Sequence, residues 1–314
     1  MSPGAASTAG RIAGVLPVVS TPFDARDGID ADVLHREVDW LISCGVDGLT
    51  IGMVSEVLRL SDHERRRLTT LVLAAAARRV PVVASIGAES TRATLALAVH
   101  AQESGASGLM AIPPAGVALT EEETSDFFRA VLDHTEVPLV VQDASGYLGH
   151  PLPLSLYVSL LDEYGPQRVF FKPEAIPIGP RLSALRDTTG GRAVVFEGTG
   201  GIALVDSHRR GVVGTMPGPE VPWAIVTLWH ALQGGDTDVA QSVHGPLAAL
   251  ISLQGSLDAF IALEKHLLVR QHVFDTDSRR HPHGYQPDPE TLLEADRLVG
   301  VLADACRIRL PHPR

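Results

Sequence analysis

Short apolar stretches alternate with amphipathic ones eight times along the chain, and this alternation limits the possible folds more than any other feature. The apolar stretches are rich in Val, Ile and Leu and have little internal alternation, which is typical of strands buried on both faces of a parallel sheet. We expect strands at residues 12–20, 46–51, 80–86, 108–112, 137–142, 169–172, 193–196 and 211–216.

The amphipathic stretches begin with helix-start signals. Asp30 is a good N-cap residue, and two capping boxes begin at Ser61 and Thr120. The last three predicted helices exceed the number that eight strand–helix units require. We expect helices at residues 30–45, from 61 onward, and at 90–105, 120–134, 154–163, 181–187, 202–210, 220–232, 237–253, 256–272 and 290–306.

Eight strand–helix units predict an α/β fold, a closed (β/α)8 TIM barrel with its active site at the C-terminal ends of the strands. The alternative is a doubly wound sheet, but no Gly-x-Gly-x-x-Gly turn follows the first strand. We predict three parts: a disordered leader at 1–11, the barrel at 12–233, and a C-terminal helical appendage at 234–314 that packs on the barrel.

Composition narrows the class of partner. The formal charge of −11 argues against nucleic acid or an anionic membrane surface, and no apolar run reaches about 18 residues. Cys44 and Cys306 lie far apart without metal-ligand spacing, which predicts a cytoplasmic protein without disulfides. His281 and His283 lack a supporting cluster of ligands, so neither a metal nor a cofactor is predicted.

Lys172 is distinctive because the chain has only two lysines, Lys172 and Lys265, among 26 basic residues. Arg cannot lose its proton in proteins, whereas a buried Lys can become neutral and attack a carbonyl carbon. Side chains alternate along a strand, so Lys172 and Glu174 would share a face at the end of the sixth strand. We predict catalytic roles for both, with a structural ion pair as the alternative. Lys265, on a helix far along the chain, is not expected there.

Several motifs follow one another in a specific order. They are Thr21-Pro22-Phe23, Gly-x-x-x-Glu at 52–56, Leu-Ser-x-x-Glu at 60–64, Val-Pro-Val-Val at 80–83, and Lys172. This order resembles that of the dihydrodipicolinate synthase and N-acetylneuraminate lyase family, from about residue 14 to 305. The resemblance implies a homo-oligomeric barrel, a tetramer or dimer, that forms an iminium between the lysine of its sixth strand and a small 2-oxo acid.

The loop at residues 52–56 corresponds to the one that holds the substrate carboxylate in this family. The resemblance implies that the amides of Val54 and Ser55 and the Ser55 hydroxyl donate to that carboxylate. Two threonines usual in the family loop are absent here. For Ser55, a hydroxyl bonded to the backbone of its own loop is an equal alternative.

Two proton-relay features of the family are missing. The usual Tyr-Asn at the end of the fifth strand is replaced by Gln142-Asp143, and the tyrosines after the fourth strand are replaced by residues 113–115. Gln142 can orient a substrate but cannot exchange protons near neutral pH. Gln-Asp, Lys-x-Glu and the glycine-rich residues 198–201 instead resemble the branch that dehydrates 2-keto-3-deoxy sugar acids.

These residues support dehydration. An ionised Glu174 would keep Lys172 protonated, so we expect the pair to share a proton. Once an iminium forms, Glu174 as carboxylate can remove a proton from the adjacent carbon, and loss of a hydroxyl one carbon further completes the reaction. Retro-aldol cleavage needs a base on that hydroxyl. Tyr147 is the nearby phenol for that role, and an exposed loop tyrosine is the alternative.

Gly198, Thr199, Gly200 and Thr215 lie at the ends of the seventh and eighth strands and are candidates to bind the rest of the substrate. Glycine-rich loops at this place of a barrel also bind phosphate, so a phosphosugar enzyme is one alternative. Another is a barrel that binds a 2-oxo acid without turning it over.

Overall fold

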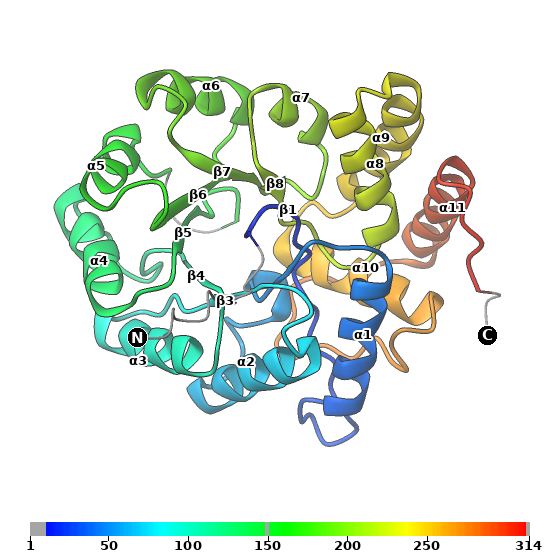
Figure 1. Ribbon diagram of the computed structural model, residues 1–314. Helices are drawn as coiled ribbons and strands as arrows, with labels where there is room; N and C mark the ends of the chain where they lie inside the picture. The colour runs from blue at the N-terminus through cyan, green and yellow to red at the C-terminus, as the bar shows by residue number, and fades with distance from the viewer. Residues whose placement is uncertain (1–10, 148–150, 312–314) are drawn as a thin grey trace, which may run out of the picture.

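The computed structural model describes residues 11–147 and 151–311, so the predicted leader lies outside the described residues except for Arg11. Eight parallel strands form one sheet in the order β1-β8-β7-β6-β5-β4-β3-β2 (Figure 1). A bridge between Val18 and Thr50 joins the two ends of this order and closes the barrel, which confirms the predicted fold. The strands are β1 Gly14–Val15, β2 Leu49–Thr50, β3 Val82–Ser85, β4 Gly108–Ala111, β5 Leu139–Asp143, β6 Val169–Pro173, β7 Val194–Glu197 and β8 Gly214–Thr215.

Helices surround the sheet, as Figure 1 shows, because each follows a strand and covers its outer face with an apolar stripe. The predicted caps are present: Asp30 accepts from two amides of the first turn, and Ser61 and Thr120 form capping boxes. The helices are α1 Ala31–Ser43, η1 Met53–Ser55, α2 Asp62–Ala76, α3 Thr91–Glu103, α4 Glu121–His134, α5 Leu154–Tyr164, α6 Ile178–Thr188, α7 Leu204–Arg209, α8 Pro222–Gly234, α9 Thr237–Ser252, α10 Leu257–Arg270 and α11 Pro289–Ala305.

The first, second and eighth strands have two residues each and are shorter than predicted. Pro17 has no amide hydrogen, and its backbone nitrogen lies on the side of β2, where Val19 donates to the Thr50 carbonyl, so Pro17 cannot add a bond between β1 and β2. On the side of β8 the amides continue to bond, Leu16 to the Thr215 carbonyl at 2.9 Å and Val18 to the Pro217 carbonyl at 2.8 Å. Backbone hydrogen bonding between these neighbouring segments therefore continues past the last residues of β1 and β8.

The sixth helix begins earlier than predicted. We expected it at 181–187, whereas α6 begins at Ile178. Pro180 lies in its first turn, where the missing amide hydrogen has no helical partner to lose. The sequence prediction treated this proline as lying outside the helix.

A separate apolar cluster fills the inside of the barrel. The neighbouring short strands β1 and β8 lie very close together: a Cβ on Gly214 would be 2.2 Å from the Gly14 carbonyl oxygen. Only glycine fits there, which explains its position in β8. The interior cluster consists of Ile12, Leu16, Val83, Met110, Val140, Phe170, Phe196 and Met216.

The C-terminal helices pack on one side of the barrel (Figure 1). Helix α9 contacts α8 and α11, and α10 contacts η1, which follows β2. Helix α10 therefore reaches the C-terminal ends of the strands. Within the described residues no single helix is long and apolar enough to cross a membrane. Helices α9 and α10 reach that length and composition only as a pair, bent by 120°.

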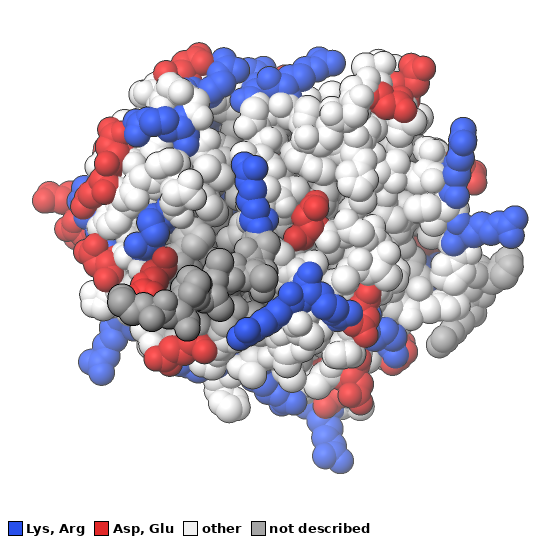
Figure 2. Space-filling view, in the orientation of Figure 1, with Lys and Arg blue, Asp and Glu red and all other residues white. Residues whose placement is uncertain are grey.

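Charged side chains are mixed in sign over the face shown in Figure 2. Acidic and basic residues are interspersed around its edge, and uncharged atoms form most of its surface. The net charge of −11 is therefore not concentrated in one patch of this face.

Candidate active site

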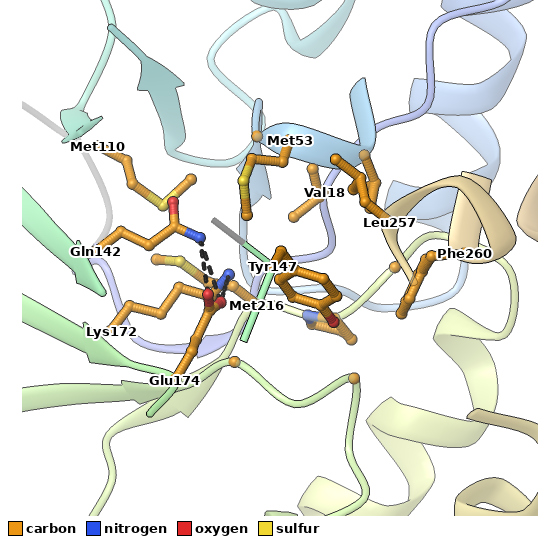
Figure 3. A pocket seen from close by; sticks show the side chains of 16 residues that line it. Val18, Met53, Met110, Gln142, Tyr147, Lys172, Glu174, Met216, Leu257 and Phe260 are labelled. Atoms are coloured by element: carbon orange, nitrogen blue, oxygen red, sulfur yellow. Dashed lines mark hydrogen bonds and ion pairs between the residues drawn. The ribbon is translucent and has the colours of Figure 1, made fainter. Parts of the chain in front are cut away.

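Lys172 and Glu174 meet at the C-terminal end of β6. The parallel register pairs Gln142 of β5 with Lys172, which places both side chains at the same level of the barrel. Lys172 and Glu174 are each 5% exposed, and Lys172 Nζ lies 2.9 Å from Glu174 Oε1 (Figure 3). The predicted pairing is present, and the two charged groups lie closer together than the backbone spacing of the two residues alone requires.

Burial governs the protonation of this pair. It raises the pKa of Glu174, while the Lys172 ammonium and the Gln142 amide oppose it. The Gln142 amide nitrogen lies 3.2 Å from Glu174 Oε1 and 3.3 Å from Oε2. Burial therefore weakens the preference of the Glu174 carboxyl for its ionised form.

Gly198 allows the pair to approach the end of β7. A Cβ at this position would lie 2.7 Å from both Lys172 Cε and Glu174 Oε1. Any side chain here would displace the reactive groups. Gly200, in the same loop, has a φ of +69°, a conformation that favours glycine.

These groups line a cavity of about 40 Å³ at the C-terminal ends of the strands. Seven of the ten predicted site residues contribute to its wall. They are Val54, Gln142, Tyr147, Lys172, Glu174, Gly198 and Gly200.

Ser55 is not part of this wall. Its side chain is buried, donates to the Val19 carbonyl at 2.5 Å and accepts from the Gly52 amide at 3.1 Å. The Ser55 amide donates to the Gly52 carbonyl at 3.1 Å. The geometry favours the alternative in which this serine stabilises its own loop. Of the two predicted amide donors, only Val54 faces the cavity.

Thr199 and Thr215 also point away from the cavity, toward Glu197. Thr215 Oγ1 donates to Glu197 Oε2 at 2.6 Å, and both the amide and hydroxyl of Thr199 donate to Oε1. The sequence analysis missed Glu197, a buried carboxylate at the end of β7. A carboxylate bound to this loop would repel a phosphate group, so the geometry disfavours the phosphosugar alternative.

Tyr147 lies over the cavity, in the loop after β5 (Figure 3). The residue is 38% exposed, yet partial burial, with Glu174, Glu197 and Glu220 nearby, raises the pKa of its phenol to about 12. The phenol is therefore neutral at pH 7 and acts there as a hydrogen-bond donor. The side chain belongs to the cavity wall despite its exposure.

Asp143 holds the two ends of the loop that carries Tyr147. Its Oδ1 accepts from the Ser145 amide and its Oδ2 from the Leu152 amide, both at 3.1 Å. Arg181 of α6 pairs with the same Oδ2 at 3.1 Å. The aspartate that replaces a family asparagine therefore has a structural role next to the site.

The rest of the cavity wall is apolar and was not predicted. Helix α10 contributes part of it, which no local pattern in the sequence indicates. The chain has only four methionines, and three of them line this cavity. Their scarcity was the one available signal in the sequence. The apolar lining residues are Val18, Met53, Met110, Met216, Leu257 and Phe260.

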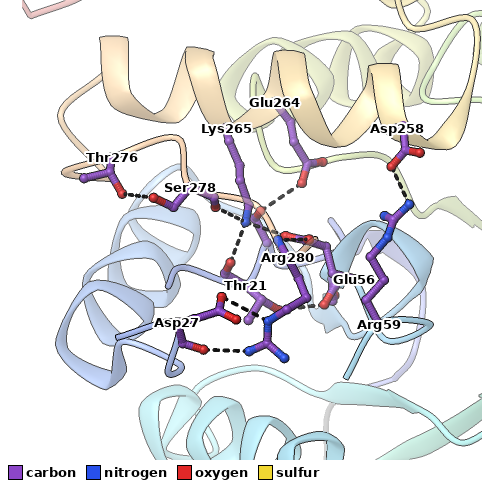
Figure 4. Close-up of polar contacts among 12 residues, drawn as sticks. Thr21, Asp27, Glu56, Arg59, Asp258, Glu264, Lys265, Thr276, Ser278 and Arg280 are labelled. Atoms are coloured by element: carbon purple, nitrogen blue, oxygen red, sulfur yellow. Dashed lines mark hydrogen bonds and ion pairs between the residues drawn. The ribbon is translucent and has the colours of Figure 1, made fainter. Parts of the chain in front are cut away.

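The second lysine lies closer to the strand ends than its sequence position suggested. Lys265 on α10 is fully buried, and its Nζ lies 2.5 Å from Glu56 Oε1 (Figure 4). It also donates to the Thr21 and Ser278 carbonyls, each at 2.7 Å. Lys265 does not line the cavity of Lys172, as the sequence predicted.

More carboxylates than cations surround Lys265. Ser20 donates through its amide to Glu37 at 2.8 Å and through its hydroxyl to Glu264 at 2.8 Å. Burial raises the pKa of Glu264 well above its usual range, and raises that of Glu37 to about 8. Burial also lowers the pKa of Lys265, while Glu56 opposes this. Ionised carboxylates would repel one another here, so protonation of a carboxylate lowers the repulsion within the cluster.

Residues with metal-ligating side chains do not gather into a site within the described chain. No group of three His, Cys, Asp or Glu residues there has the spacing to hold an ion. The rings of His281 and His283 stack with centroids 4.3 Å apart.

Comparison with known proteins places the chain in a family. The profile of the dihydrodipicolinate synthetase family matches residues 11–285. The L-2-keto-3-deoxyarabonate dehydratase of Azospirillum brasilense is 30% identical over 308 residues, which are 96% of each chain.

Solved structures show the same fold. Dihydrodipicolinate synthase from Rhodopseudomonas palustris is 24% identical, with a TM-score of 0.84 over 92% of this chain and 97% of that one. YagE from Escherichia coli K12, solved in complex with pyruvate, is 24% identical, with a TM-score of 0.83 over 93% of this chain and 99% of that one.

Proposed function

The chain belongs to the dihydrodipicolinate synthetase family, and from this membership we propose that it is a lyase that forms a Schiff base between Lys172 and a 2-oxo acid. The observation that carries the proposal is the buried Lys172–Glu174 pair, 2.9 Å apart in a cavity at the catalytic end of the barrel. A 2-keto-3-deoxy sugar acid is the first class to assay, because a relative over 96% of the chain is named as a dehydratase of such a compound.

The first step is attack of the amine on the C2 carbonyl carbon. Proton transfer from the Lys172 ammonium to Glu174 supplies the neutral nucleophile. Burial favours this transfer because it raises the pKa of Glu174. Loss of water from the resulting carbinolamine gives the iminium.

The second step is removal of a proton from C3. The fixed charge of the iminium favours carboxylate at Glu174, and the Gln142 amide orients that carboxylate. The C3 proton and the C4 hydroxyl leave together as water. Hydrolysis of the iminium then releases an unsaturated 2-oxo acid, without an oxidant or a reductant.

We assign the substrate carboxylate to the Val54 side of the cavity, because Val54 belongs to the loop at residues 52–56 and lines the cavity. Tyr147 is suited to donate a hydrogen bond to the leaving hydroxyl, because its phenol stays neutral at pH 7. In this arrangement Tyr147 acts as a donor and Glu174 as the base.

We also propose that the protein is a homo-oligomer, a dimer or a tetramer, by analogy with the family. Light scattering at micromolar concentration should give a mass of at least twice the 33.4 kDa chain. A mass near that of one chain would reject this part of the proposal.

Borohydride trapping tests the proposed Schiff base. Incubation with pyruvate and borohydride should add one reduced pyruvate to the chain, and peptide mapping should locate it at Lys172. Lys172→Arg should abolish the adduct while circular dichroism stays unchanged, because Arg keeps the charge but lacks a nucleophilic amine. An adduct confined to Lys265 would exclude the proposal.

A further inference from the structure

The three methionines that follow Met1 all lie at the cavity of Lys172. Apart from Met1, the chain contains only Met53, Met110 and Met216. They come from η1, the end of β4 and the segment after β8, and all three line the cavity (Figure 3). Methionine is apolar and flexible, so it adapts to irregular apolar groups. Three separate elements thus supply the same kind of surface.

Helix α10 completes this surface from the opposite side. Leu257 and Phe260 line the cavity, and Figure 3 shows the Tyr147 ring between Phe260 and the pair of Lys172 and Glu174. Phe260 is held close to the wall, because a Cβ on Gly218 would lie 2.5 Å from its ring. The apolar wall is therefore built from both the barrel and the C-terminal helices.

The hydroxyl groups that could have bound a sugar chain are directed elsewhere. Ser55 donates to the Val19 carbonyl, and Thr215 and Thr199 both donate to Glu197. None of these three hydroxyl residues lines the cavity. A polyhydroxylated substrate would find few partners among them.

The polar groups of the cavity are concentrated at one end. Lys172, Glu174 and Gln142 contact one another, and Tyr147 is the remaining polar side chain among the described residues of the wall. That end suits the C2 carbonyl and the reacting carbons. Beyond it the cavity offers apolar contacts.

We propose that the enzyme acts on a 2-oxo acid whose chain beyond C4 is apolar, alkyl or aryl, rather than polyhydroxylated. This inference rests on the proposed function, because the Schiff base fixes which end of the substrate lies at Lys172. A hydroxyl buried without a partner loses its hydration, whereas an apolar group gains by leaving water. The chemistry is unchanged: the C3 proton and C4 hydroxyl leave as water.

Two acids with the same five-carbon backbone test the inference. 4-Hydroxy-2-oxopentanoate and 2-keto-3-deoxyarabonate share the C4 hydroxyl and differ only by a hydroxyl at C5. The measurement is the acid concentration that gives half-maximal borohydride adduct on Lys172, read by intact mass and counting any dehydrated adduct. We expect a value at least tenfold lower for 4-hydroxy-2-oxopentanoate, about 1.4 kcal/mol. 4-Phenyl-2-oxobutanoate should require a lower concentration still.

The outcomes separate the two proposals. An equal or lower half-maximal concentration for 2-keto-3-deoxyarabonate would overturn the apolar specificity and would not affect the proposed Schiff base. No adduct with either acid or with pyruvate would overturn both.

A variant locates the source of the preference. Met53→Gln keeps the side-chain length and adds a polar group, so the tenfold ratio should fall to about threefold or less. Leu293→Gln is the matched control, because Leu293 lies 68% exposed on α11, outside the cavity wall, and the ratio should stay at its wild-type value. A ratio unchanged in Met53→Gln would contradict the role of the methionine surface.

Discussion

The two lysines of this chain have similar burial and very different surroundings. Lys172 is 5% exposed and Lys265 is fully buried, and each pairs with one glutamate at 2.9 Å or 2.5 Å. Within the described chain, the Lys172 ammonium has Glu174 as its one protein acceptor and borders an open cavity. Burial with a carboxylate therefore does not distinguish a reactive lysine from a structural one.

The number of acceptors makes the distinction. Lys265 donates to Glu56 and to two backbone carbonyls, which uses all three hydrogens of an ammonium (Figure 4). A neutral amine has two hydrogens and would leave one buried carbonyl unsatisfied. At Lys172 the ammonium proton can move to Glu174, and no other acceptor in the described chain loses a hydrogen bond as a result. We infer that Lys172 can become a nucleophile and that Lys265 stays an ammonium.

Replacing the nucleophile should give the largest effect. Lys172→Arg keeps a positive charge beside Glu174 but has no amine that can form an iminium. Turnover of any 2-oxo acid that the wild type processes should fall at least about ten-thousandfold, as for other catalytic nucleophiles. Steady-state kinetics measures this, and the urea unfolding midpoint should change little. Robust turnover by the variant would end the distinction between the lysines.

Removing the structural ammonium should act on stability instead. Lys265→Met leaves Glu56 buried without its cation, which typically costs about 3–5 kcal/mol of the free energy of unfolding. Lys172→Met is the matched control and should cost less, because Glu174 can be protonated at its raised pKa. Urea unfolding of both variants compares them. Equal losses would show that the two pairs are energetically alike.

Glu174→Gln should separate the two chemical steps. The amide keeps the shape of the side chain and removes the base, so borohydride should still trap an iminium at Lys172. Turnover should fall by about a hundredfold, the lower range for loss of a general base. A variant with trapping and near wild-type turnover would move the base role to Tyr147 or to a water molecule.

The reactive pair could be predicted from sequence because it depends on local rules. Strand alternation placed Lys172 and Glu174 on one face, and the barrel rule placed that face at the catalytic end. The family resemblance added Gln142, and the register of β5 and β6 places it beside Lys172. The strand alternation is a short-range relation, and the structure repeats it.

The rest of the site depends on contacts between distant segments. Lys265 reaches Glu56, more than two hundred residues earlier, because α10 packs against η1. The same packing delivers Leu257 and Phe260 to the cavity. Composition and periodicity predict that α10 forms, but they do not predict which end of the barrel it covers. The two alternatives for Ser55 could not be separated from sequence for a similar reason, since its acceptor belongs to the first strand segment.

Carboxylates outnumber cations around Lys265, so this cluster should make the stability of the protein depend on pH. Of the effects that distinguish the two lysines, we expect this one to be the smallest. Glu37 Oε1 accepts from the Ser20 amide, and its Oε2 has no hydrogen-bond partner in the described chain. Burial raises its pKa to about 8, with the Ser20 amide and Lys265 opposing. An unfolded Glu has a pKa of about 4.3, so the folded protein binds the extra proton more tightly. This contribution to stability is complete below pH ~4.3 and is lost as the pH rises toward 8.

Glu37→Gln cannot ionise and keeps an oxygen for the Ser20 amide, so its stability should depend less on pH than that of the wild type. Between pH 5 and 8 the wild type should lose on the order of 2 kcal/mol more than the variant. Some dependence should persist, because the pKa of Glu264, which shares Ser20, is also raised. Urea unfolding at several pH values measures the difference, with Glu103→Gln on the exposed side of α3 as the control. Parallel losses in the wild type and in Glu37→Gln would mean that Glu37 is ionised in the native protein and that Lys265 balances two carboxylates.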